Sequence, residues 1–310
     1  MKVLVTCPPM LHNLEEFRPR FERQGIDVDA PAVVQTLTEA ELVRRIPNCH
    51  GWIIGDDPAT RAVFAAGKAG VLKAAVKWGV GVDNVDFTAA RELGIVVANT
   101  PQMFGREVAD VAMSYVTALA RDLVTVDREV RGGRWPKPSG ISLAGRTVAL
   151  IGYGDIGRQT ARRLLAADMR VIAYDPALDR LSPHDSIETA RWPERIEEAD
   201  FVVLTCALTV DNRHMLNRGI LARSRRGVRV VNVARGPLID ESALAQALES
   251  HQVSAAALDV FEKEPLPPDS PLRQCERCIL GSHNASNTVD AVRRASERAI
   301  DLLFDFLGVS

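Results

Sequence analysis

Apolar residues along the chain gather into short runs that alternate with stretches of helical periodicity. The runs KVLVT, GWIIG and LKAAVKWGV lie within the first 80 residues, with helical patterns near residues 13–24 and from Glu39 to Ile46 between them. Short apolar runs that alternate with helices are typical of βαβ units, in which the strands run parallel. The first part of the chain is therefore predicted to contain a parallel sheet.

The same alternation continues in the second half of the chain. A strand, a helix and a second strand are predicted within residues 146–175, and four further apolar runs follow, namely FVVLTCA, VRVVNVA, SAAALDV and CILGSH. Polar or helical intervals separate these runs, as a doubly wound sheet requires. The pattern predicts the α/β class, with two doubly wound parallel-sheet domains.

Two longer stretches with helical periodicity are placed to connect these domains. One runs from Phe104 to Leu123 and the other from Val289 to Leu307. The stretch RGGRWPKPSGIS, which follows the first, is rich in Gly, Pro and Arg and predicts a surface arm or linker. We expect the last helix to return to the N-terminal domain. The predicted domains are residues 1–100 with 286–310, and residues 101–285.

Residues 146–175 carry glycines at the spacing of a dinucleotide-binding unit. The predicted strand ends at Gly152, Gly154 and Gly157 follow, and Asp175 lies 175 − 157 = 18 residues past the last glycine. In such units the first glycine allows a tight turn, the second lets the backbone approach a pyrophosphate, and the third lets helix and strand pack closely. The N–H groups at the start of the helix then face the phosphates.

The acid at the end of this unit favours NAD over NADP. The carboxylate of Asp175 would accept hydrogen bonds from the ribose hydroxyls and would repel a 2′-phosphate. No Arg follows it immediately, and Arg180, five positions further on, is the basic residue that would have to fold back to bind such a phosphate. We therefore predict NAD as the cofactor.

Three chemically active side chains follow the last three apolar runs, where parallel strands end at one edge of the sheet. These are Arg235, Glu264 and His283, and Asp259 also lies at a strand end. Imidazole exchanges protons near neutral pH, a neighbouring carboxylate orients it, and a guanidinium binds a carboxylate through two hydrogen bonds. Each residue alone also fits an ordinary surface or structural role. Their convergence beside a dinucleotide motif favours hydride transfer to or from an oxygen-bearing carbon.

The strings VNVARGPLID, ALDVFEKEPLP and GSHNASNT, with GYGDIG and YDP upstream, resemble the D-isomer-specific 2-hydroxyacid dehydrogenases. KWGVGVDNVD and VANTP resemble the substrate-domain signature of that family, so the resemblance covers nearly the whole chain. It implies a Rossmann-type cofactor domain inserted in a flavodoxin-like substrate domain. Two positions depart from the family pattern, because Asp155 stands where Arg is frequent and Ala207 where many members carry Pro.

The resemblance also implies a set of site residues. Arg235 would bind and polarise the substrate, Glu264 would support the imidazole, and His283 would exchange the proton. The predicted cofactor-binding residues are Gly152, Gly154, Asp155, Ile156, Gly157, Asp175, Cys206, Ala234 and Asp259, the last as partner of the nicotinamide carboxamide. The predicted substrate-binding residues are Lys77, Arg235 and, through their main-chain N–H groups, Val80 and Gly81.

The substrate itself stays open at this stage. A basic residue before GVGVDNVD, here Lys77, looks most like the D-3-phosphoglycerate dehydrogenases, in which that position helps to bind the substrate phosphate. A solvated lysine fits the sequence equally well, and the adjacent Trp78 would reshape the pocket. Alternatives are a glyoxylate or hydroxypyruvate reductase, a phosphite-oxidising enzyme and, from another class, an NAD(H)-sensing corepressor-like protein. Because the chain stops at Ser310, we expect no C-terminal regulatory domain.

Composition narrows the class of partner. The 38 basic and 40 acidic residues give a formal net charge of −2 without long blocks of either sign, which argues against nucleic-acid and membrane binding. The N-terminus has no signal-peptide pattern, so we expect a cytoplasmic protein. Five scattered cysteines predict reduced thiols, and the pair Cys275 and Cys278 lacks the further ligands of a zinc site. Family resemblance implies a homodimer.

Overall fold

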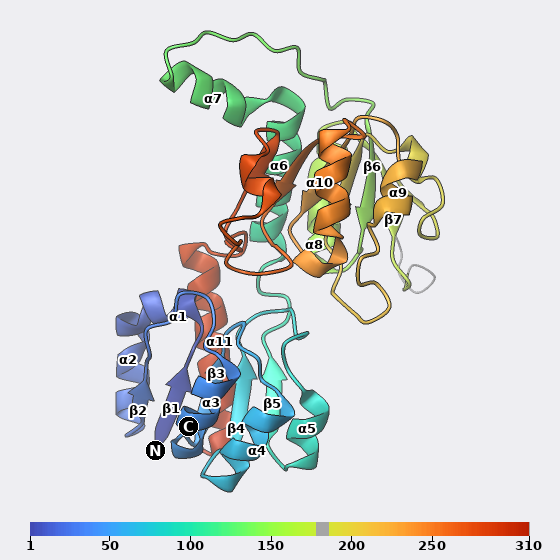
Figure 1. Cartoon of the computed structure of the whole chain (residues 1–310). Helices are drawn as coiled ribbons and strands as arrows, with labels where there is room; N and C mark the ends of the chain where they lie inside the picture. The colour runs from blue at the N-terminus through green and yellow to red at the C-terminus, as the bar shows by residue number, and fades with distance from the viewer. Residues whose placement is uncertain (178–185, 310) are drawn as a thin grey trace. The chain divides into compact units, whose positions relative to one another are not determined.

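The computed structural model describes residues 1–177 and 186–309, and the chain divides into two compact units. Unit 1 comprises Met1–Phe104 together with Asn287–Ser310, and unit 2 comprises Gly105–Ser286. Figure 1 labels the elements of each unit. The whole of unit 2 is thus inserted into the sequence of unit 1.

Unit 1 is built on a five-stranded parallel sheet with the strand order β2-β1-β3-β4-β5. This is the flavodoxin-like order, which reverses direction between β1 and β3. The strands are β1 (Lys2–Val5), β2 (Asp27–Asp29), β3 (Gly51–Ile54), β4 (Ala74–Lys77) and β5 (Val96–Asn99). The helices are α1 (Pro8–His12), α2 (Leu14–Arg23), α3 (Glu39–Arg45), η1 (Ile46–Asn48), α4 (Arg61–Ala69), α5 (Phe87–Glu92) and α11 (Val289–Leu307).

Helices cover both faces of the unit 1 sheet. Helices α3, α4 and α5 contact one another, while α1 and α11 form a separate contact, and the rings of Phe21 on α2 and Phe304 on α11 meet edge to face at 5.5 Å. Helix α3 begins with a capping box, in which Thr38 N donates to the Glu41 carboxylate at 2.8 Å and Glu41 N donates to Thr38 Oγ1 at 3.3 Å. The returning helix α11 has the bounds that the sequence pattern predicts.

Unit 2 contains a seven-stranded parallel sheet with the order β12-β11-β10-β9-β6-β7-β8. The strands are β6 (Thr147–Ile151), β7 (Arg170–Tyr174), β8 (Ile187–Thr189), β9 (Phe201–Leu204), β10 (Val228–Asn232), β11 (Val253–Leu258) and β12 (Cys278–Leu280). The helices are α6 (Gly105–Arg121), α7 (Leu123–Arg131), α8 (Asp155–Ala166), η3 (Ile196–Glu198), α9 (Arg218–Arg223), η4 (Gly236–Leu238), α10 (Glu241–Glu249) and η5 (Pro271–Gln274). The order reverses between β6 and β9, as in Rossmann-type sheets.

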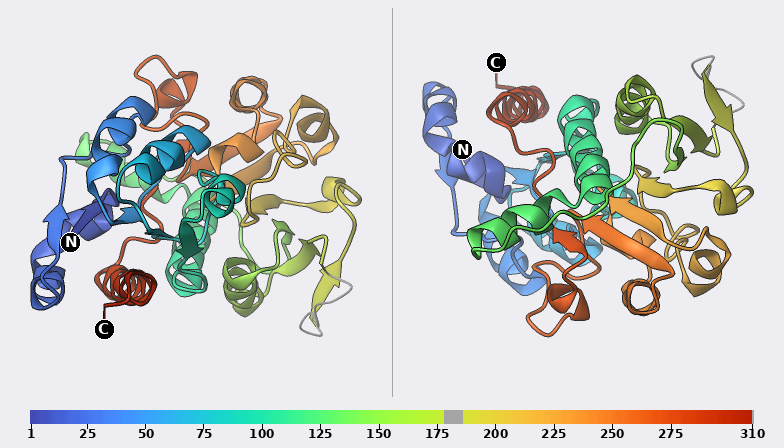
Figure 2. Two further views of the ribbon diagram at one scale, coloured as in Figure 1. Left: turned by 90° about the horizontal axis from the view of Figure 1, so that it is seen from below. Right: turned by 90° about the horizontal axis from the view of Figure 1, so that it is seen from above.

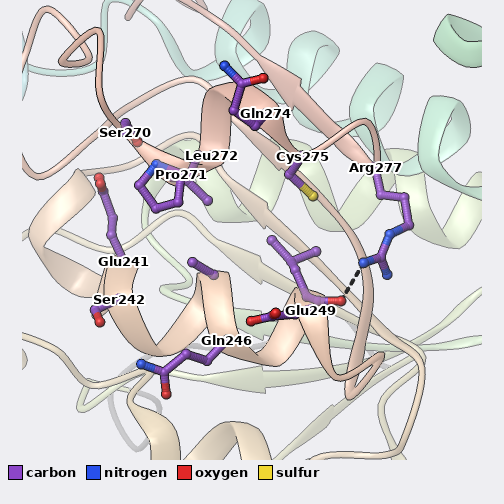
Figure 3. Close-up of a pocket in the computed structure, with 12 residues that line it drawn as sticks. Glu241, Ser242, Gln246, Glu249, Ser270, Pro271, Leu272, Gln274, Cys275 and Arg277 are labelled. Atoms are coloured by element: carbon purple, nitrogen blue, oxygen red, sulfur yellow. Dashed lines mark hydrogen bonds between the residues drawn. The ribbon is translucent and has the colours of Figure 1, made fainter.

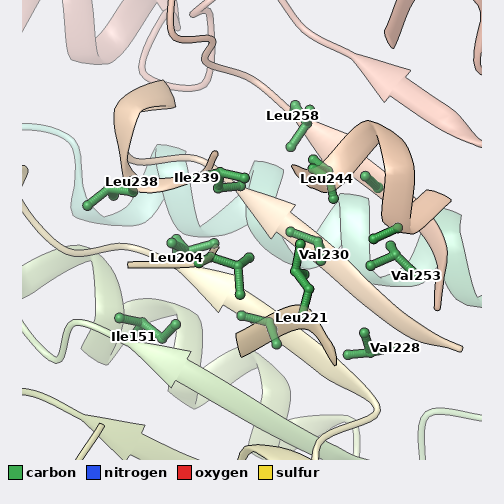
Figure 4. Close-up of a cluster of buried hydrophobic side chains, with 14 of the residues drawn as sticks. Ile151, Leu204, Leu221, Val228, Val230, Leu238, Ile239, Leu244, Val253 and Leu258 are labelled. Carbon is green, nitrogen blue, oxygen red and sulfur yellow. The ribbon is translucent and has the colours of Figure 1, made fainter. Parts of the chain in front are cut away.

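Figure 2 shows unit 2 as three layers, with α6 and α8 on one side of the sheet and α9 and α10 on the other. A cluster of buried hydrophobic side chains in unit 2 lies under α9 and α10. In this cluster Leu221 and Leu244 from the helices meet Leu204, Val230 and other strand residues (Figure 4). The central strands β6 and β9 are buried along their whole length because helices cover both of their faces. The predicted fold class, two α/β domains with doubly wound parallel sheets, is confirmed.

The long helix predicted from Phe104 to Leu123 ends earlier than its periodicity suggests. Helix α6 stops at Arg121, Asp122 adopts a left-handed conformation with φ of 52°, and α7 starts in a new direction at Leu123. Residues 134–142, within the predicted arm, form neither helix nor strand. The break at Asp122 therefore separates α6, which has one buried face, from α7, in which no residue is buried.

Candidate active site

The glycine turn after β6 lies at the point where the strand order of unit 2 reverses. Gly152 has φ of +95°, and a Cβ atom there would lie 2.6 Å from the Cα atom of Cys206, the second residue after β9. A Cβ atom at Gly157 would lie 2.1 Å from the Gly152 carbonyl oxygen, whereas one at Gly154 would meet nothing within 4 Å. Two glycines thus permit close packing and the third leaves open space. This geometry fits a dinucleotide whose pyrophosphate approaches the turn.

The turn is held in place from two neighbouring strands. Thr205 Oγ1 donates to the carbonyl oxygens of Ile151 at 3.1 Å and Gly152 at 2.8 Å. Asp175, directly after β7, accepts hydrogen bonds from Tyr153 N at 2.7 Å and Ala177 N at 2.8 Å. Asp175 therefore lies beside the turn, as its predicted role requires. Arg180 lies outside the described residues.

The remaining predicted cofactor residues surround the same end of the sheet. Asp155 is the first residue of α8, and its carboxylate lies against Gly105 at the start of α6, with the half-buried Ile156 next to it. Burial raises the pKa of the Cys206 thiol to about 12, which keeps it neutral at physiological pH. Ala234 is buried after β10, and its N–H donates to Asn232 Oδ1 at 3.0 Å. Together with Asp175, which follows β7, these residues lie after the ends of β6, β9 and β10.

Glu264 and His283 meet at the ends of neighbouring strands β11 and β12. His283 Nδ1 lies 2.7 Å from Glu264 Oε2, and Glu264 Oε1 accepts a hydrogen bond from Phe261 N at 2.9 Å. About a fifth of each side chain is exposed, 23% for His283 and 20% for Glu264. The carboxylate is thus fixed by the main chain and fixes the imidazole in turn. Such a pair can hold an imidazole ring ready to give or take a proton at its other nitrogen, Nε2.

Asp259, the residue after β11, supports the turn that carries His283. Its carbonyl oxygen accepts from His283 N at 2.6 Å, and its buried carboxylate accepts from Asn284 N at 3.1 Å and Ala285 N at 2.8 Å. His283 adopts a left-handed conformation with φ of 55°. Such a conformation is uncommon outside glycine and persists where surrounding contacts determine it.

Arg235 follows β10 and starts the short helix η4. Its Nη1 donates to the Ala234 carbonyl at 2.9 Å, and its own carbonyl accepts from Asn232 Nδ2 at 2.9 Å. The next residue, Gly236, packs so closely that a Cβ atom would lie 1.8 Å from the carbonyl carbon of Phe261. The turn of Arg235 therefore lies directly on the loop that leads to Glu264.

The predicted substrate residues Lys77, Val80 and Gly81 belong to unit 1. The loop after β4 is closed by Thr100, whose Oγ1 accepts from Gly79 N at 2.8 Å, and by Asn99, whose Nδ2 donates to the Val80 carbonyl at 3.3 Å. Val80 is exposed, and within the described part of the chain the N–H groups of Val80 and Gly81 donate to no protein acceptor. Two adjacent main-chain donors that have no acceptor in the described part of the protein can bind a carboxylate.

Lys77 is not the solvated lysine that the sequence left as an alternative. Its side chain is 3% exposed, and Nζ donates to the Gly55 carbonyl at 2.6 Å and to Asp56 Oδ1 at 2.8 Å. The pairing of β3 with β4 sets Ile54 opposite Lys77, so Gly55 and Asp56 follow directly. The ammonium group is therefore engaged within unit 1.

Several residues that support the site carried no signal of their own in the sequence. These are the common loop and strand-end residues Thr205, Asn232, Asn84 and Asp56. The partners of Thr205, Asn84 and Asp56 lie 21 or more residues away in the chain, whereas Asn232 contacts the nearby Arg235. The position of each directly after or near a predicted strand end is the only signal that points to them.

A cavity of about 780 Å³ lies elsewhere in unit 2, between α10 and η5. Glu249, Cys275 and Arg277 are among the residues that line it (Figure 3), and Arg277 donates a hydrogen bond to the Leu248 carbonyl. None of the predicted site residues lines this cavity. Within residues 1–177 and 186–309, no group of three or more His, Cys, Asp or Glu side chains is arranged to hold a metal ion. All five cysteines are free thiols.

No helix in the described part of the chain is long and apolar enough to cross a membrane.

Comparison with known proteins gives consistent results. Residues 113–285 match the family model described as D-isomer specific 2-hydroxyacid dehydrogenase, NAD binding domain. The chain is 36% identical over 279 residues to a hydroxypyruvate reductase from Thermotoga maritima, covering 88% of this chain and 90% of the relative. It is 36% identical over 300 residues to a D-3-phosphoglycerate dehydrogenase from Methanocaldococcus jannaschii, covering 95% of this chain and 55% of the relative. A solved structure from Thermus thermophilus superposes with a TM-score of 0.87 at 33% identity, covering 99% of this chain and 97% of that one.

Proposed function

Since the chain belongs to the D-isomer-specific 2-hydroxyacid dehydrogenase family and is an NAD-dependent oxidoreductase of 2-hydroxy and 2-oxo acids, we propose that it reduces a small, unphosphorylated 2-oxo acid. Hydroxypyruvate and glyoxylate are the substrates of this class to test first. We further propose that Arg235, Glu264 and His283 carry the reaction.

The observation that carries this proposal is the contact of 2.7 Å between His283 Nδ1 and Glu264 Oε2. When NADH is bound, it supplies the hydride that reduces the carbonyl carbon. The carbonyl oxygen then needs a proton, and His283 Nε2 delivers it while Glu264 stabilises the positive imidazole. Arg235 binds the substrate carboxylate and polarises the carbonyl. In unit 1, the N–H groups of Val80 and Gly81, which donate to no acceptor among the described residues, are proposed as donors to a substrate carboxylate.

Two observations favour an unphosphorylated substrate. The Lys77 ammonium, the only basis in the sequence for a phosphate site, is paired with Asp56. The hydroxypyruvate reductase from Thermotoga maritima matches over 90% of its length, whereas the phosphoglycerate dehydrogenase matches over 55%. Reduction of 3-phosphohydroxypyruvate, the reverse of 3-phospho-D-glycerate oxidation, is the second candidate because the KWGVGVDNVD string resembles that subgroup.

The direct test is NADH oxidation, followed by absorbance, in a panel of glyoxylate, hydroxypyruvate, pyruvate and 3-phosphohydroxypyruvate. NADPH is run in parallel, and D-2-hydroxy acids with NAD test the reverse direction. Turnover of glyoxylate or hydroxypyruvate with NADH supports the proposal. NADH binding by fluorescence without turnover of any acid contradicts it and favours the corepressor-like alternative.

His283→Ala tests the assignment of the proton donor. The variant keeps the glycine turn intact, so we expect NADH binding to be unchanged while kcat falls by about 10²- to 10⁴-fold, the range for loss of a general acid. Steady-state kinetics and NADH fluorescence titration measure the two effects separately. Turnover equal to that of the wild type would show that another group donates the proton.

We also propose that the enzyme acts in the cytoplasm as a homodimer. The five free thiols suit a reducing compartment. Exposed apolar residues of α7 and the following arm, including Leu123, Val130 and Trp135, supply a surface for a second copy.

A further inference from the structure

Lys77 is the last residue of β4, and its ammonium group lies close to the start of the loop that carries Val80 and Gly81. A Cβ atom at Gly79 would lie 3.8 Å from Lys77 Nζ, and Val80 and Gly81 follow at once. A phosphate on a substrate bound to this loop is therefore within reach of Lys77, if Lys77 is available. The contacts of Lys77 decide whether it is.

Two of the three donors of Lys77 are occupied by Gly55 and Asp56. The pair is unequally exposed, because the Lys77 side chain is 3% exposed and that of Asp56 is 36% exposed. An anion that approaches from solvent meets the carboxylate before it meets the ammonium. The pair as a whole carries no net charge, so it offers no attraction for a phosphate.

The segment that carries Asp56 is held firmly. The next residue, Asp57, is fully buried, and its carboxylate accepts from Leu37 N at 2.7 Å and Gly55 N at 3.1 Å. Burial raises the pKa of the Asp57 carboxyl. Asn84, at the far end of the loop, donates to the carbonyl oxygens of Gly55 at 3.1 Å and Asp57 at 2.7 Å.

The carbonyl oxygen of Gly55 accepts hydrogen bonds from Lys77 and from Asn84, which lie at the two ends of the loop. Asp56 sits between two anchored residues and is further contacted by Gln35 Nε2 at 3.4 Å. The main chain on both sides of Asp56 is thus fixed, and its carboxylate contacts both Lys77 and Gln35. The ion pair is a built feature of the loop rather than a chance surface contact.

We propose that Asp56 is a specificity-determining residue, which neutralises Lys77 and excludes 2-oxo acids that carry a phosphate. This inference rests on the proposed function, because it names the residue that restricts the substrate to the unphosphorylated class. Like charges brought together cost enough to discriminate between substrates. Removal of the Asp56 charge would free the ammonium for a phosphate.

The test compares kcat/KM for 3-phosphohydroxypyruvate with kcat/KM for hydroxypyruvate, both with NADH. In Asp56→Asn the ratio should rise by about tenfold or more, which corresponds to about 1.4 kcal/mol, mainly through a lower KM for the phosphorylated acid. Asp301→Asn is the matched control, because Asp301 is also an ion-paired acid of unit 1 but pairs with Arg20 on the surface. This variant should leave the ratio unchanged.

A double variant shows whether the effect acts through Lys77. Asp56→Asn combined with Lys77→Met keeps a side chain of similar length in the buried position, and the gained preference for the phosphorylated acid should disappear. Asp56→Ser provides a second replacement if the Asn variant does not fold by circular dichroism. Its ratio should rise as well.

Three outcomes are distinguishable. A wild type active on hydroxypyruvate, with a ratio that neither Asp56 variant raises, overturns the role of Asp56 and leaves the proposed function standing. A wild type that already prefers the phosphorylated acid overturns both. A rise in the ratio that persists without Lys77 shows that Asp56 acts by repulsion alone and contradicts the proposed neutralisation.

Discussion

At the scale of the residue, Gly154 and Gly157 need to be glycine for different reasons. Gly157 lies against the Gly152 carbonyl, whereas Gly154 faces open space. Overpacking a tight site costs typically about 1–3 kcal/mol. The folded chain alone therefore requires glycine at 157, and only a ligand would require it at 154.

This difference predicts opposite behaviour for two alanine variants. Gly157→Ala should lower the free energy of unfolding by about 1–3 kcal/mol. Gly154→Ala should change it by less than about 0.5 kcal/mol, as surface substitutions do, but should weaken NADH binding because the methyl group occupies space predicted for the pyrophosphate. Urea unfolding and NADH fluorescence titration measure the two quantities. Unchanged NADH affinity in Gly154→Ala would contradict the predicted position of the pyrophosphate.

Glu264 predicts a change in the pH profile as well as in rate. The neutral amide in Glu264→Gln no longer stabilises a positive imidazole, so the pH above which reduction declines should move downward and kcat should fall by about 10- to 100-fold. Glu249→Gln, which removes an exposed acid from α10, is the control. A profile that stays in place while kcat falls would assign Glu264 a purely structural role.

Some site residues are predictable because their residue type and their position after an apolar run are both visible in the sequence. Asp175 and His283 follow apolar runs at predicted strand ends, and both lie there in the structure. The ion pair of Lys77 with Asp56 was not predictable, because only the pairing of β3 with β4 brings the two residues together. The sequence does not distinguish a lysine that faces solvent from a buried lysine that is paired with a carboxylate.

At the scale of the element, a network of charged side chains adds to the strand pairing and apolar packing at the β8 edge of the unit 2 sheet. Arg170 on β7 pairs with Glu188 on β8 at 2.5 Å and with Glu198 on η3 at 2.7 Å, and Arg195 contacts both acids. Hydrogen bonds from Arg170 and Arg195 lower the pKa of Glu188 from 4.5 to about 2. The short strand β8 is thus joined to β7 by a network of four charged side chains.

The lowered pKa predicts a stability that depends on pH. A carboxylate with a depressed pKa in the folded state stabilises it fully above the ordinary pKa of 4.5, and this contribution is lost as the pH falls towards 2. Glu188→Gln should therefore destabilise the protein at neutral pH, and its difference from the wild type should vanish in strong acid. Urea unfolding across this pH range measures both. Glu197→Gln, an exposed neighbour, should show no such pH dependence.

Strands were predicted correctly where burial on both faces of the sheet makes their sequences apolar. Strands β6 and β9 are almost entirely apolar because helices cover both faces of the sheet, and β10 is apolar except for Arg229 and Asn232. The edge strand β2, with the sequence DVD, and the edge strand β8, with IET, were not predicted. Three-residue edge strands contain too few buried positions to produce a pattern, and charged residues suit an edge that must not pair with another chain.

At the scale of the whole molecule, α7 predicts assembly. It has no buried residue, and Leu123 and Val130 lie seven residues apart, two turns along one face. The double variant Leu123→Asp with Val130→Asp should shift the protein from dimer to monomer in sedimentation equilibrium. Val210→Asp, at an even more exposed apolar residue of unit 2, is the control and should leave the mass unchanged. A wild type that sediments as a monomer would contradict the proposed dimer.

The insertion of unit 2 into unit 1 fixes the order in which the ribosome completes the two units. Helix α11 packs on β3 and β4, where Leu303 and Leu307 lie within 3.2 Å of a Cβ position at Gly51. All of unit 2 is translated before α11 emerges, so the nascent unit 1 sheet keeps an uncovered apolar face throughout that time. Unit 2 can finish folding before unit 1, although translation of unit 1 begins earlier. Chaperones that shield apolar surfaces on nascent chains would therefore act chiefly on unit 1, whose first segment is translated before unit 2.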